Sequence, residues 1–308
     1  MDHPTSSKLQ LLERILAVSK KVRVFSPAKV NLFLKVFRQR KDGFHDILSW
    51  MQMVDLQDQI EIEKIPRGID IICDQKSVPT DSGNLAYWAV ELFLRKTKSA
   101  GGVRVKIKKK IPVGAGLGGG SSNAASVLIG LQKLFKTKLT LAELALLAKK
   151  LGSDVPFFFT SGSALAAGRG EKLYSLNLPL NYWLVLVNPG FEVSTKWAYS
   201  QVEPGPIKHR STLKAKQLTI AEMLIQLKKL GNDFQKIVCR RFPEVGSIIQ
   251  KLEKSGALYA AMSGSGPTAF GIFESRNAAG QAARRVARKK SWKSWVVKPI
   301  KVGPDGLP

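Results

Sequence analysis

The most unusual chemistry-bearing feature of the chain is a glycine-rich run near its middle. Five of the seven residues from Gly114 to Gly120 are glycine, although glycine weakens both helices and strands. Glycine does let backbone N–H groups approach an anion closely, and a helix predicted to begin near Ser121 would direct its positive end to the same point. The run predicts a phosphate-binding loop, and the alternative is a flexible linker.

Two familiar phosphate-binding motifs each fail here at one residue. Gly114-x-Gly116-x-x-Gly119 matches the dinucleotide-binding fingerprint, but residues 120–142 contain no Asp or Glu, where that fingerprint needs one. The same run approaches the P-loop pattern, except that Gly120 stands in place of the phosphate-binding lysine. We therefore expect a phosphate loop of another kind.

Asp154 and Lys29 are a carboxylate and an amine whose types suit chemistry beside a bound phosphate. Phosphoryl transfer needs a carboxylate near the attacking hydroxyl and positive charge near the γ-phosphate. Asp154 follows a predicted helix and precedes Val155-Pro156, which predicts an extended exit, although Asp154 could instead cap a turn. Lys29 lies in a mostly apolar strand, where a lysine more often faces solvent.

Hydrophobic periodicity predicts the elements that carry these residues. In the first half we expect a helix at 7–20, two strands within 22–38 that break near Pro27, strands at 60–74 and 103–111, and helices at 84–97, 121–135 and 140–151. In the second half we expect a buried strand at 181–190, a loop at 204–216, helices at 219–230, 244–255 and 277–290, two strands joined by a turn within 259–273, and a strand at 295–300. This order predicts an α+β fold.

Composition limits the class of protein. The 308 residues, 44% of them hydrophobic, suffice for one large or two modest domains. A net charge of +26 favours anionic partners, whether nucleotides, nucleic acid or anionic lipid. Cys73 and Cys239 form neither a zinc motif nor a disulfide scaffold, so a cytoplasmic location is the simplest expectation. We expect no signal peptide and no membrane span.

Several separated segments together resemble the GHMP kinase superfamily. The likeness extends over about residues 22–300 and is closest to the family that acts on 4-diphosphocytidyl-2-C-methyl-D-erythritol in non-mevalonate isoprenoid biosynthesis. The segments are PAKVNLFLKV (27–36), KDGFHDI (41–47), PVGAGLGGGSSNAA (112–125), LGSDVPFF (151–158) and MSGSGPTAFGIF (262–273).

The resemblance implies a two-domain α+β GHMP-kinase fold. An N-terminal extension (1–21) would precede an ATP-binding domain like the second domain of ribosomal protein S5 (22–179) and a ferredoxin-like C-terminal domain (180–308). The implied reaction transfers the γ-phosphoryl group of ATP, with Mg²⁺, to the 2-hydroxyl of the nucleotide-linked substrate. Asp154 would be the general base, and Lys29 would hold it and offset the γ-phosphate charge. Monomer and homodimer both remain open.

The resemblance also assigns binding residues. Phe44, His45 and Tyr199 would hold the cytidine, and Asn31 would bond the substrate near the reacting hydroxyl, although Tyr199 could be a core residue and His45 a surface-turn residue. Ser121 or Ser122 could offer a hydroxyl to the metal, which we expect to be held mainly by phosphates and water. The ATP-binding residues would be Asn84, Lys109, Pro112, Val113, Gly114, Ala115, Gly116, Leu117, Gly118, Gly119, Gly120, Ser121 and Ser122.

The sequence departs from the family pattern at two residues, and it leaves two rival functions open. Ala115 replaces a glycine common in the family and Ser153 an alanine, and neither change removes chemistry. Lys109 lies in a lysine run and could simply be solvated. A basic stretch at 284–295, with two tryptophans, could bind nucleic acid. A homoserine- or mevalonate-type kinase would keep the chemistry with another substrate.

Overall fold

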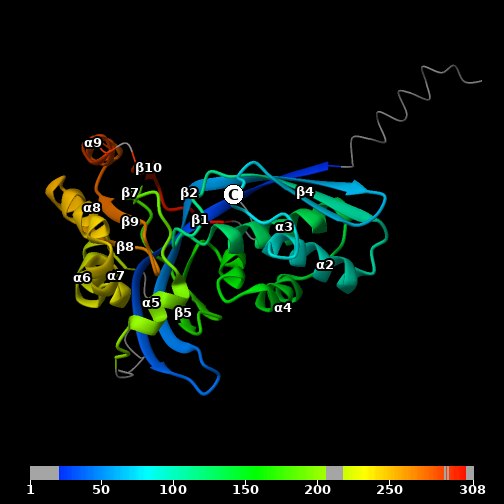
Figure 1. Cartoon of the computed structure of the whole chain (residues 1–308), viewed down its shortest axis with the longest axis horizontal. Helices are drawn as coiled ribbons and strands as arrows, with labels where there is room; N and C mark the ends of the chain where they lie inside the picture. Colours follow the sequence, from blue (N-terminus) through cyan, green and yellow to red (C-terminus); the bar gives the residue numbers. More distant parts are fainter. Residues whose placement is uncertain (1–20, 206–217, 288, 290, 303–308) are drawn as a thin grey trace, which may run out of the picture.

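The computed structural model describes residues 21–205, 218–287, 289 and 291–302. The helix predicted at 7–20 and most of the loop predicted at 204–216 lie outside the described residues. Strands and helices are mixed along the chain without strict alternation, as the α+β prediction requires (Figure 1). None of the helices in the described part of the chain combines the length and the apolar character needed to span a bilayer.

The first sheet is built around a long antiparallel ribbon. It consists of β1 (Lys21–Gln39), β2 (His45–Ile65), β3 (Ile69–Cys73), β4 (Gly102–Lys108), β5 (Ser163–Gly168) and β6 (Lys172–Ser175), in the order β3-β4-β2-β5-β6 with β1 paired to β2. The two strands predicted within 22–38 are a single strand. Its register shifts between Pro27 and Ala28, because a bulge in an edge strand accommodates a residue that lacks an N–H group.

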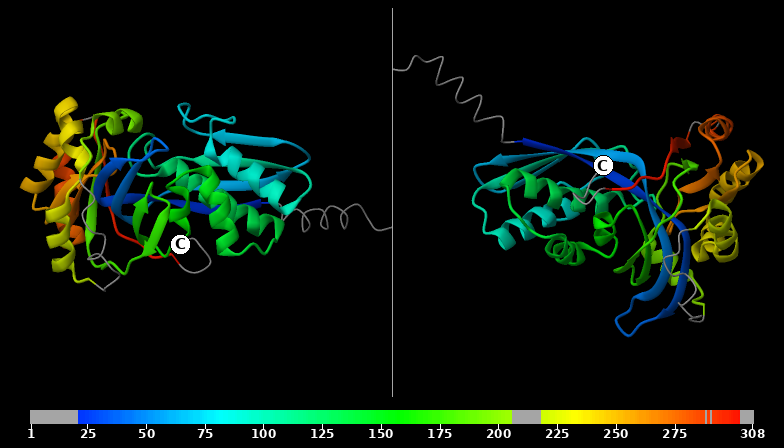
Figure 2. Two further views of the ribbon diagram at one scale, coloured as in Figure 1. Left: turned by 90° about the horizontal axis from the view of Figure 1, so that it is seen from below. Right: turned by 180° about the vertical axis from the view of Figure 1, so that it is seen from behind.

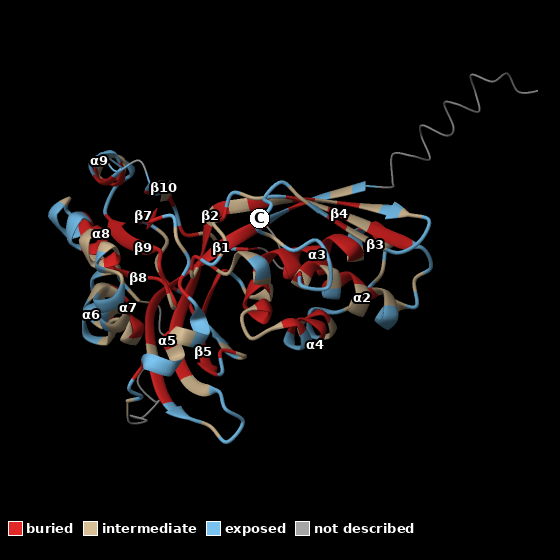
Figure 3. Cartoon of the chain, in the orientation of Figure 1, coloured by how far each residue is buried: buried red, intermediate tan, exposed pale blue. Residues whose placement is uncertain are grey.

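Helices cover one face of this sheet. They are α2 (Leu85–Thr97), α3 (Gly119–Phe135) and α4 (Leu141–Leu151), and a short 3₁₀ helix, η1 (Val155–Phe159), packs against α3 and α4. These helices agree closely with the predicted ones. Their apolar stripes and the inner face of the strands form one hydrophobic core, whose buried layer is visible in Figure 3.

The second sheet has the order β10-β7-β9-β8, formed by β7 (Trp183–Asn188), β8 (Tyr259–Met262), β9 (Ala269–Phe273) and β10 (Lys293–Val297). All neighbouring strands are antiparallel, and β9 lies between β7 and β8. This is the split βαβ order of a ferredoxin-like domain. The helices α6 (Ile220–Leu230), α7 (Asp233–Arg241), α8 (Pro243–Lys254) and α9 (Arg276–Val286) lie on its outer side (Figure 2).

The two sheets meet over a shared core. One hydrophobic cluster contains Ala28 and Val30 of β1 together with Leu184 of β7 and Phe270 of β9. The division predicted at residue 180 falls between β6 and β7 and stays a prediction. A short helix, α5 (Thr195–Gln201), packs against α7 and lies between the end of β7 and the second layer of helices.

Candidate active site

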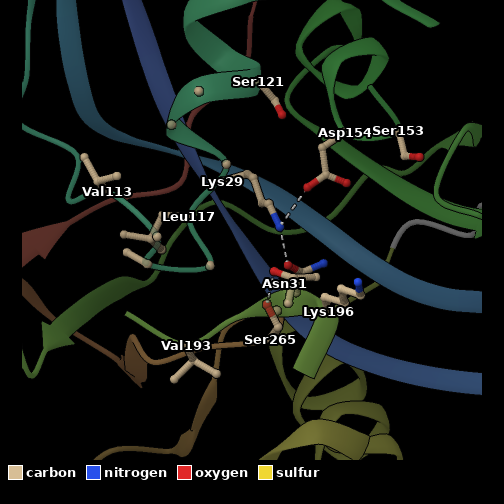
Figure 4. Close-up of a pocket in the computed structure, with 18 of the residues that line it drawn as sticks. Lys29, Asn31, Val113, Leu117, Ser121, Ser153, Asp154, Val193, Lys196 and Ser265 are labelled. Carbon is tan, nitrogen blue, oxygen red and sulfur yellow. Dashed lines mark hydrogen bonds and ion pairs between the residues drawn. The ribbon is translucent and has the colours of Figure 1, made fainter. Parts of the chain in front are cut away.

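A cavity of about 920 Å³ brings together most of the predicted site. Its wall contains β1, the β1–β2 hairpin, the glycine-rich loop, the start of α3, the segment after α4 and helix α5 (Figure 4). Segments separated by more than a hundred residues in the sequence therefore face one space. This size is at the upper end of the range for small-molecule sites.

The glycine-rich loop needs its glycines for two different reasons. Gly114, Gly116 and Gly118 have φ of +59°, +75° and +68°, a region that disfavours side chains. A Cβ on Gly116 would also lie 2.3 Å from the carbonyl oxygen of Ser263, whereas a Cβ on Gly120 would meet nothing within 4 Å. Gly120 therefore borders open space at the N-terminus of α3, where free N–H groups favour an anion.

Hydrogen bonds from distant elements hold this loop. The Ser263 hydroxyl donates to the Gly116 carbonyl oxygen at 3.0 Å and accepts from the Asn31 N–H at 3.1 Å. The Lys29 N–H donates to the Leu117 carbonyl oxygen at 3.0 Å. Ala115 is buried, and its φ is not positive, so alanine is tolerated where the family often has glycine. Ser263 belongs to MSGSGPTAFGIF, the one signal in the sequence that pointed to it.

Lys29 and Asp154 form an ion pair at the centre of the cavity. The Lys29 Nζ lies 3.3 Å from Asp154 Oδ2, and the two side chains are 5% and 34% exposed. The Lys29 ammonium also donates to Asn31 Oδ1 at 2.5 Å, and the Asn31 amide donates to Ser49 Oγ at 2.7 Å. Both amide atoms of Asn31 thus bind protein groups, which indicates that Asn31 positions Lys29.

The backbone around Asp154 differs from the prediction. The extended exit predicted from Val155-Pro156 is wrong, because both residues begin the 3₁₀ helix η1. Proline is tolerated there, since the first turn of a helix does not use its N–H groups. The Asp154 side chain makes no capping hydrogen bond to η1, so the alternative role as a turn cap is also wrong. Its carboxylate faces the cavity instead.

Aromatic rings gather at one end of the cavity. His45 and Tyr199 stack with ring centroids 5.4 Å apart, while Phe44 is 51% exposed with the Arg169 guanidinium 4.7 Å from its ring centroid. His45 Nδ1 lies 2.9 Å from the Phe37 carbonyl oxygen, which can only accept, so Nε2 is the free acceptor of the neutral ring. Burial, with the nearby charge of Asp154, raises the pKa of Tyr199 to about 12, so its hydroxyl stays protonated.

Asn84 and Lys109 lie at the other end, and each has a structural partner. The Asn84 side chain caps α2 by accepting from the Ala86 N–H at 2.9 Å. Lys109 is not a solvated lysine, because its side chain is only 5% exposed and pairs with Asp58, which is fully buried. A Cβ on Gly119 would lie 3.1 Å from Lys109 Nζ. The Lys109 charge thus sits beside the start of α3.

The two serines after the glycines differ in their surroundings. Ser121 lines the cavity together with Pro112 and Val113, whereas the buried Ser122 hydroxyl accepts from Ser26 Oγ at 2.7 Å. Ser121 is therefore the hydroxyl that could reach a metal ion. Among the described residues, no three His, Cys, Asp or Glu side chains gather as a metal site.

Four residues of the site were missed in the sequence. Asp58 supports Lys109, Ser49 supports Asn31, and Arg169 and Lys196 add positive charge to the cavity wall. Arg169 follows β5 and Lys196 belongs to α5. Neither short element was predicted, because β5 consists of small residues apart from Leu165, and α5 spans only seven residues with one buried side chain.

Comparison with known proteins identifies the family of this chain. The models of the GHMP kinases N-terminal domain and the GHMP kinases C-terminal domain match residues 84–176 and 216–291. A curated protein of Citrifermentans bemidjiense, named 4-diphosphocytidyl-2-C-methyl-D-erythritol kinase, is 42% identical over 285 residues, which cover 91% of this chain and 100% of that protein.

Solved structures agree with these sequence comparisons. The crystal structure of a 4-(cytidine 5'-diphospho)-2C-methyl-D-erythritol kinase aligns with a TM-score of 0.75 and 34% identity, over 92% of this chain and 100% of that one. A homoserine kinase from Cytophaga hutchinsonii aligns with a TM-score of 0.68 over 92% and 96% of the two chains, but at 19% identity it shares the fold alone. The predicted two-domain fold is thereby confirmed, and the chain belongs to the GHMP kinases, in the family whose curated members are named 4-diphosphocytidyl-2-C-methyl-D-erythritol kinase.

Proposed function

We propose that this chain transfers the γ-phosphoryl group of ATP to the 2-hydroxyl of 4-diphosphocytidyl-2-C-methyl-D-erythritol, giving the 2-phosphate and ADP in non-mevalonate isoprenoid biosynthesis. The Lys29–Asp154 pair is the observation that carries the proposal. It lies in one cavity with an open helix N-terminus and a group of aromatic rings. The family membership supports the substrate. The two free cysteines are compatible with a cytoplasmic location.

Different groups in the cavity carry out different parts of the proposed reaction. The N–H groups at the start of α3 bind the phosphates of ATP, and Asp154 accepts the proton of the 2-hydroxyl as its oxygen attacks the γ-phosphorus. The bond to the β-phosphate oxygen breaks, and ADP leaves. Lys29 holds the Asp154 carboxylate in place and offsets the charge on the transferred group. A magnesium ion, which the Ser121 hydroxyl could help to hold, would neutralise phosphate charge.

The aromatic end of the cavity is suited to binding the base of a nucleotide-linked substrate. Phe44 offers an exposed ring face, and His45 and Tyr199 present polar atoms beside it. Aromatic rings stack on any base, and the free ring nitrogen of His45 can accept from the amino group of cytosine. Mevalonate and homoserine have no base that would use such a surface, so the aromatic rings favour the nucleotide-linked substrate over those two.

The rival nucleic-acid function finds no support in the basic C-terminal stretch. Trp292 is buried, and its indole N–H donates to Glu244. Trp295 is half-buried within β10, paired with Leu186. Neither ring is presented for stacking on bases, which sequence-tolerant nucleic-acid binding requires.

The test is ADP release from ATP·Mg²⁺ with three acceptors in parallel: 4-diphosphocytidyl-2-C-methyl-D-erythritol, mevalonate and homoserine. We expect turnover with the first alone. Asp154→Asn should lower kcat by about 10²- to 10⁴-fold with little change in the KM for ATP. Turnover with mevalonate or homoserine only would keep the kinase and overturn the substrate, and an Asp154→Asn enzyme of normal rate would overturn the base.

A further inference from the structure

Helix α5 brings a lysine without a protein partner to the cavity wall. Lys196 lines the cavity, and in the part of the chain that the structure describes it makes no hydrogen bond or ion pair. The other two lysines of the wall are engaged, Lys29 with Asp154 and Lys109 with Asp58. The free ammonium group of Lys196 is therefore available to a ligand.

The two ends of α5 lie against different parts of the site. At the C-terminal end, Tyr199 stacks on His45. At the N-terminal end, the Thr195 and Ser265 hydroxyls share a hydrogen bond of 2.9 Å. Gly264, which precedes Ser265, is so near Asn31 that a Cβ on it would lie 3.1 Å from Asn31 Oδ1. The helix therefore runs from the neighbourhood of the catalytic pair to the aromatic end.

Lys196 stands between these two ends. It lies three residues before Tyr199, so both side chains share one face of the helix, about one turn apart. In Figure 4 the Lys29–Asp154 pair lies between Ser121 on one side and Lys196 on the other. Lys196 is thus drawn across the ion pair from the start of α3, where the proposed function places the phosphates of ATP.

We propose that Lys196 binds the diphosphate of the nucleotide-linked substrate and so helps to select that substrate. The proposal rests on the proposed function. A ligand whose base stacks beside Tyr199 and whose hydroxyl reaches Asp154 must pass its diphosphate along this face of α5. An ammonium group forms short, charge-assisted hydrogen bonds with phosphate oxygens. Lys196 is exposed, so its replacement should change binding and leave folding intact.

Calorimetric titration with CDP and with cytidine tests this contact without turnover. We expect the wild-type chain to bind CDP about tenfold more tightly than cytidine, because a hydrogen bond to a charged group contributes that much. Lys196→Ala should lose most of this difference and keep its affinity for cytidine, while Lys196→Arg should retain it. Lys254→Ala, which removes an exposed lysine at the end of α8 outside the cavity wall, is the matched charge control.

Kinetics supply an independent readout. Lys196→Ala should raise the KM for the nucleotide-linked substrate about tenfold, with the KM for ATP and kcat nearly unchanged. A Lys196→Ala chain that keeps the wild-type preference for CDP over cytidine overturns the proposal and leaves the proposed function standing. If Lys196→Ala weakened the binding of CDP and of cytidine equally, the proposal would also be overturned. A wild-type chain that binds neither ligand overturns the proposed function as well.

Discussion

Asn31 is a buried amide whose two polar atoms both bind protein groups. Its oxygen accepts from the Lys29 ammonium and its nitrogen donates to Ser49 Oγ, which in turn donates to the Phe33 carbonyl oxygen at 2.6 Å. The chain of bonds fixes the side chain that faces Asp154. Asn31 lines the cavity, and the hydrogen bond to the substrate that the resemblance implies stays a prediction.

Replacing Asn31 distinguishes the two roles. We expect Asn31→Ala to lower kcat by about tenfold to a hundredfold, because Lys29 loses the group that orients it, and to leave both KM values within about twofold. Ser49→Ala should give a smaller change of the same kind. Steady-state kinetics with both substrates measures this, and a large rise in the KM for the phosphate acceptor at constant kcat would show that Asn31 contacts that substrate.

In the glycine-rich loop and the first turn of α3, the effect of an added methyl group on stability and on ATP binding should depend on the position. At Gly120 a methyl group would enter open space and would replace a helical glycine. We therefore expect Gly120→Ala to stabilise the fold by about 0.5–1 kcal/mol. The same methyl group would obstruct the approach of phosphate, so the KM for ATP should rise about tenfold or more.

Gly116→Ala is the matched comparison for that loop. Its Cβ would meet the Ser263 carbonyl oxygen at 2.3 Å, and its φ is +75°. We expect a loss of stability of about 1–3 kcal/mol there. Thermal unfolding and ATP kinetics on both variants provide the measurement. If Gly120→Ala kept the wild-type KM for ATP, the phosphates would not lie at the start of α3.

Cross-strand ion pairs line the first sheet on the face opposite the helices. Glu63 of β2 lies 2.8 Å from Lys21 Nζ, 3.3 Å from Arg104 Nη1 and 3.4 Å from Lys106 Nζ. The hydrogen bond from Lys21, followed by those from Arg104 and Lys106, lowers the pKa of Glu63 from 4.5 to about 2. A lowered pKa stabilises the folded state above pH 4.5, and this contribution is lost as the pH falls toward 2.

Glu63→Gln should therefore destabilise the protein by about 1 kcal/mol at neutral pH, the upper range for ion pairs near solvent. The difference from the wild-type chain should shrink below pH 4.5 and vanish near pH 2. Urea unfolding across this range measures it, with Glu253→Gln on the exposed side of α8 as a control. A difference that persisted unchanged at pH 2 would mean that charge on Glu63 is not its cause.

The regular elements followed from the sequence where local patterns suffice. The helices α2, α3 and α4 have clear apolar stripes, and Asn84 and Thr140 cap α2 and α4. Their predicted ranges are close to the observed ones. The helix α7 was not predicted; it spans only nine residues, of which Phe234 and Val238 are buried. Likewise Lys109 looked solvated, since its partner Asp58 is 51 residues away in the sequence.

The whole chain has a net charge of +26 and two anionic ligands to bind under the proposed function. Its cavity wall carries Lys29, Lys109, Arg169 and Lys196, against Asp154 as the acidic side chain among the wall residues that the structure describes. A positive field of this kind draws anions toward the cavity and raises their local concentration. The excess positive charge would then speed the association of both nucleotides with the cavity, in addition to keeping the protein soluble.

Ionic strength separates this long-range effect from chemistry. Raising NaCl from about 0.05 to 0.5 M shortens the Debye length from about 14 Å to about 4 Å, so the distant lysines should no longer act on the approaching nucleotides. We expect kcat/KM for both substrates to fall about tenfold while kcat at saturation changes less than twofold, because Lys29 is buried against Asp154 and is screened weakly. Lys254→Glu at low salt should reproduce only a small part of the fall, since one charge of many is reversed. A kcat/KM that is insensitive to salt would show that the net charge does not speed the association of the substrates. The charge would then act on the solubility of the protein alone.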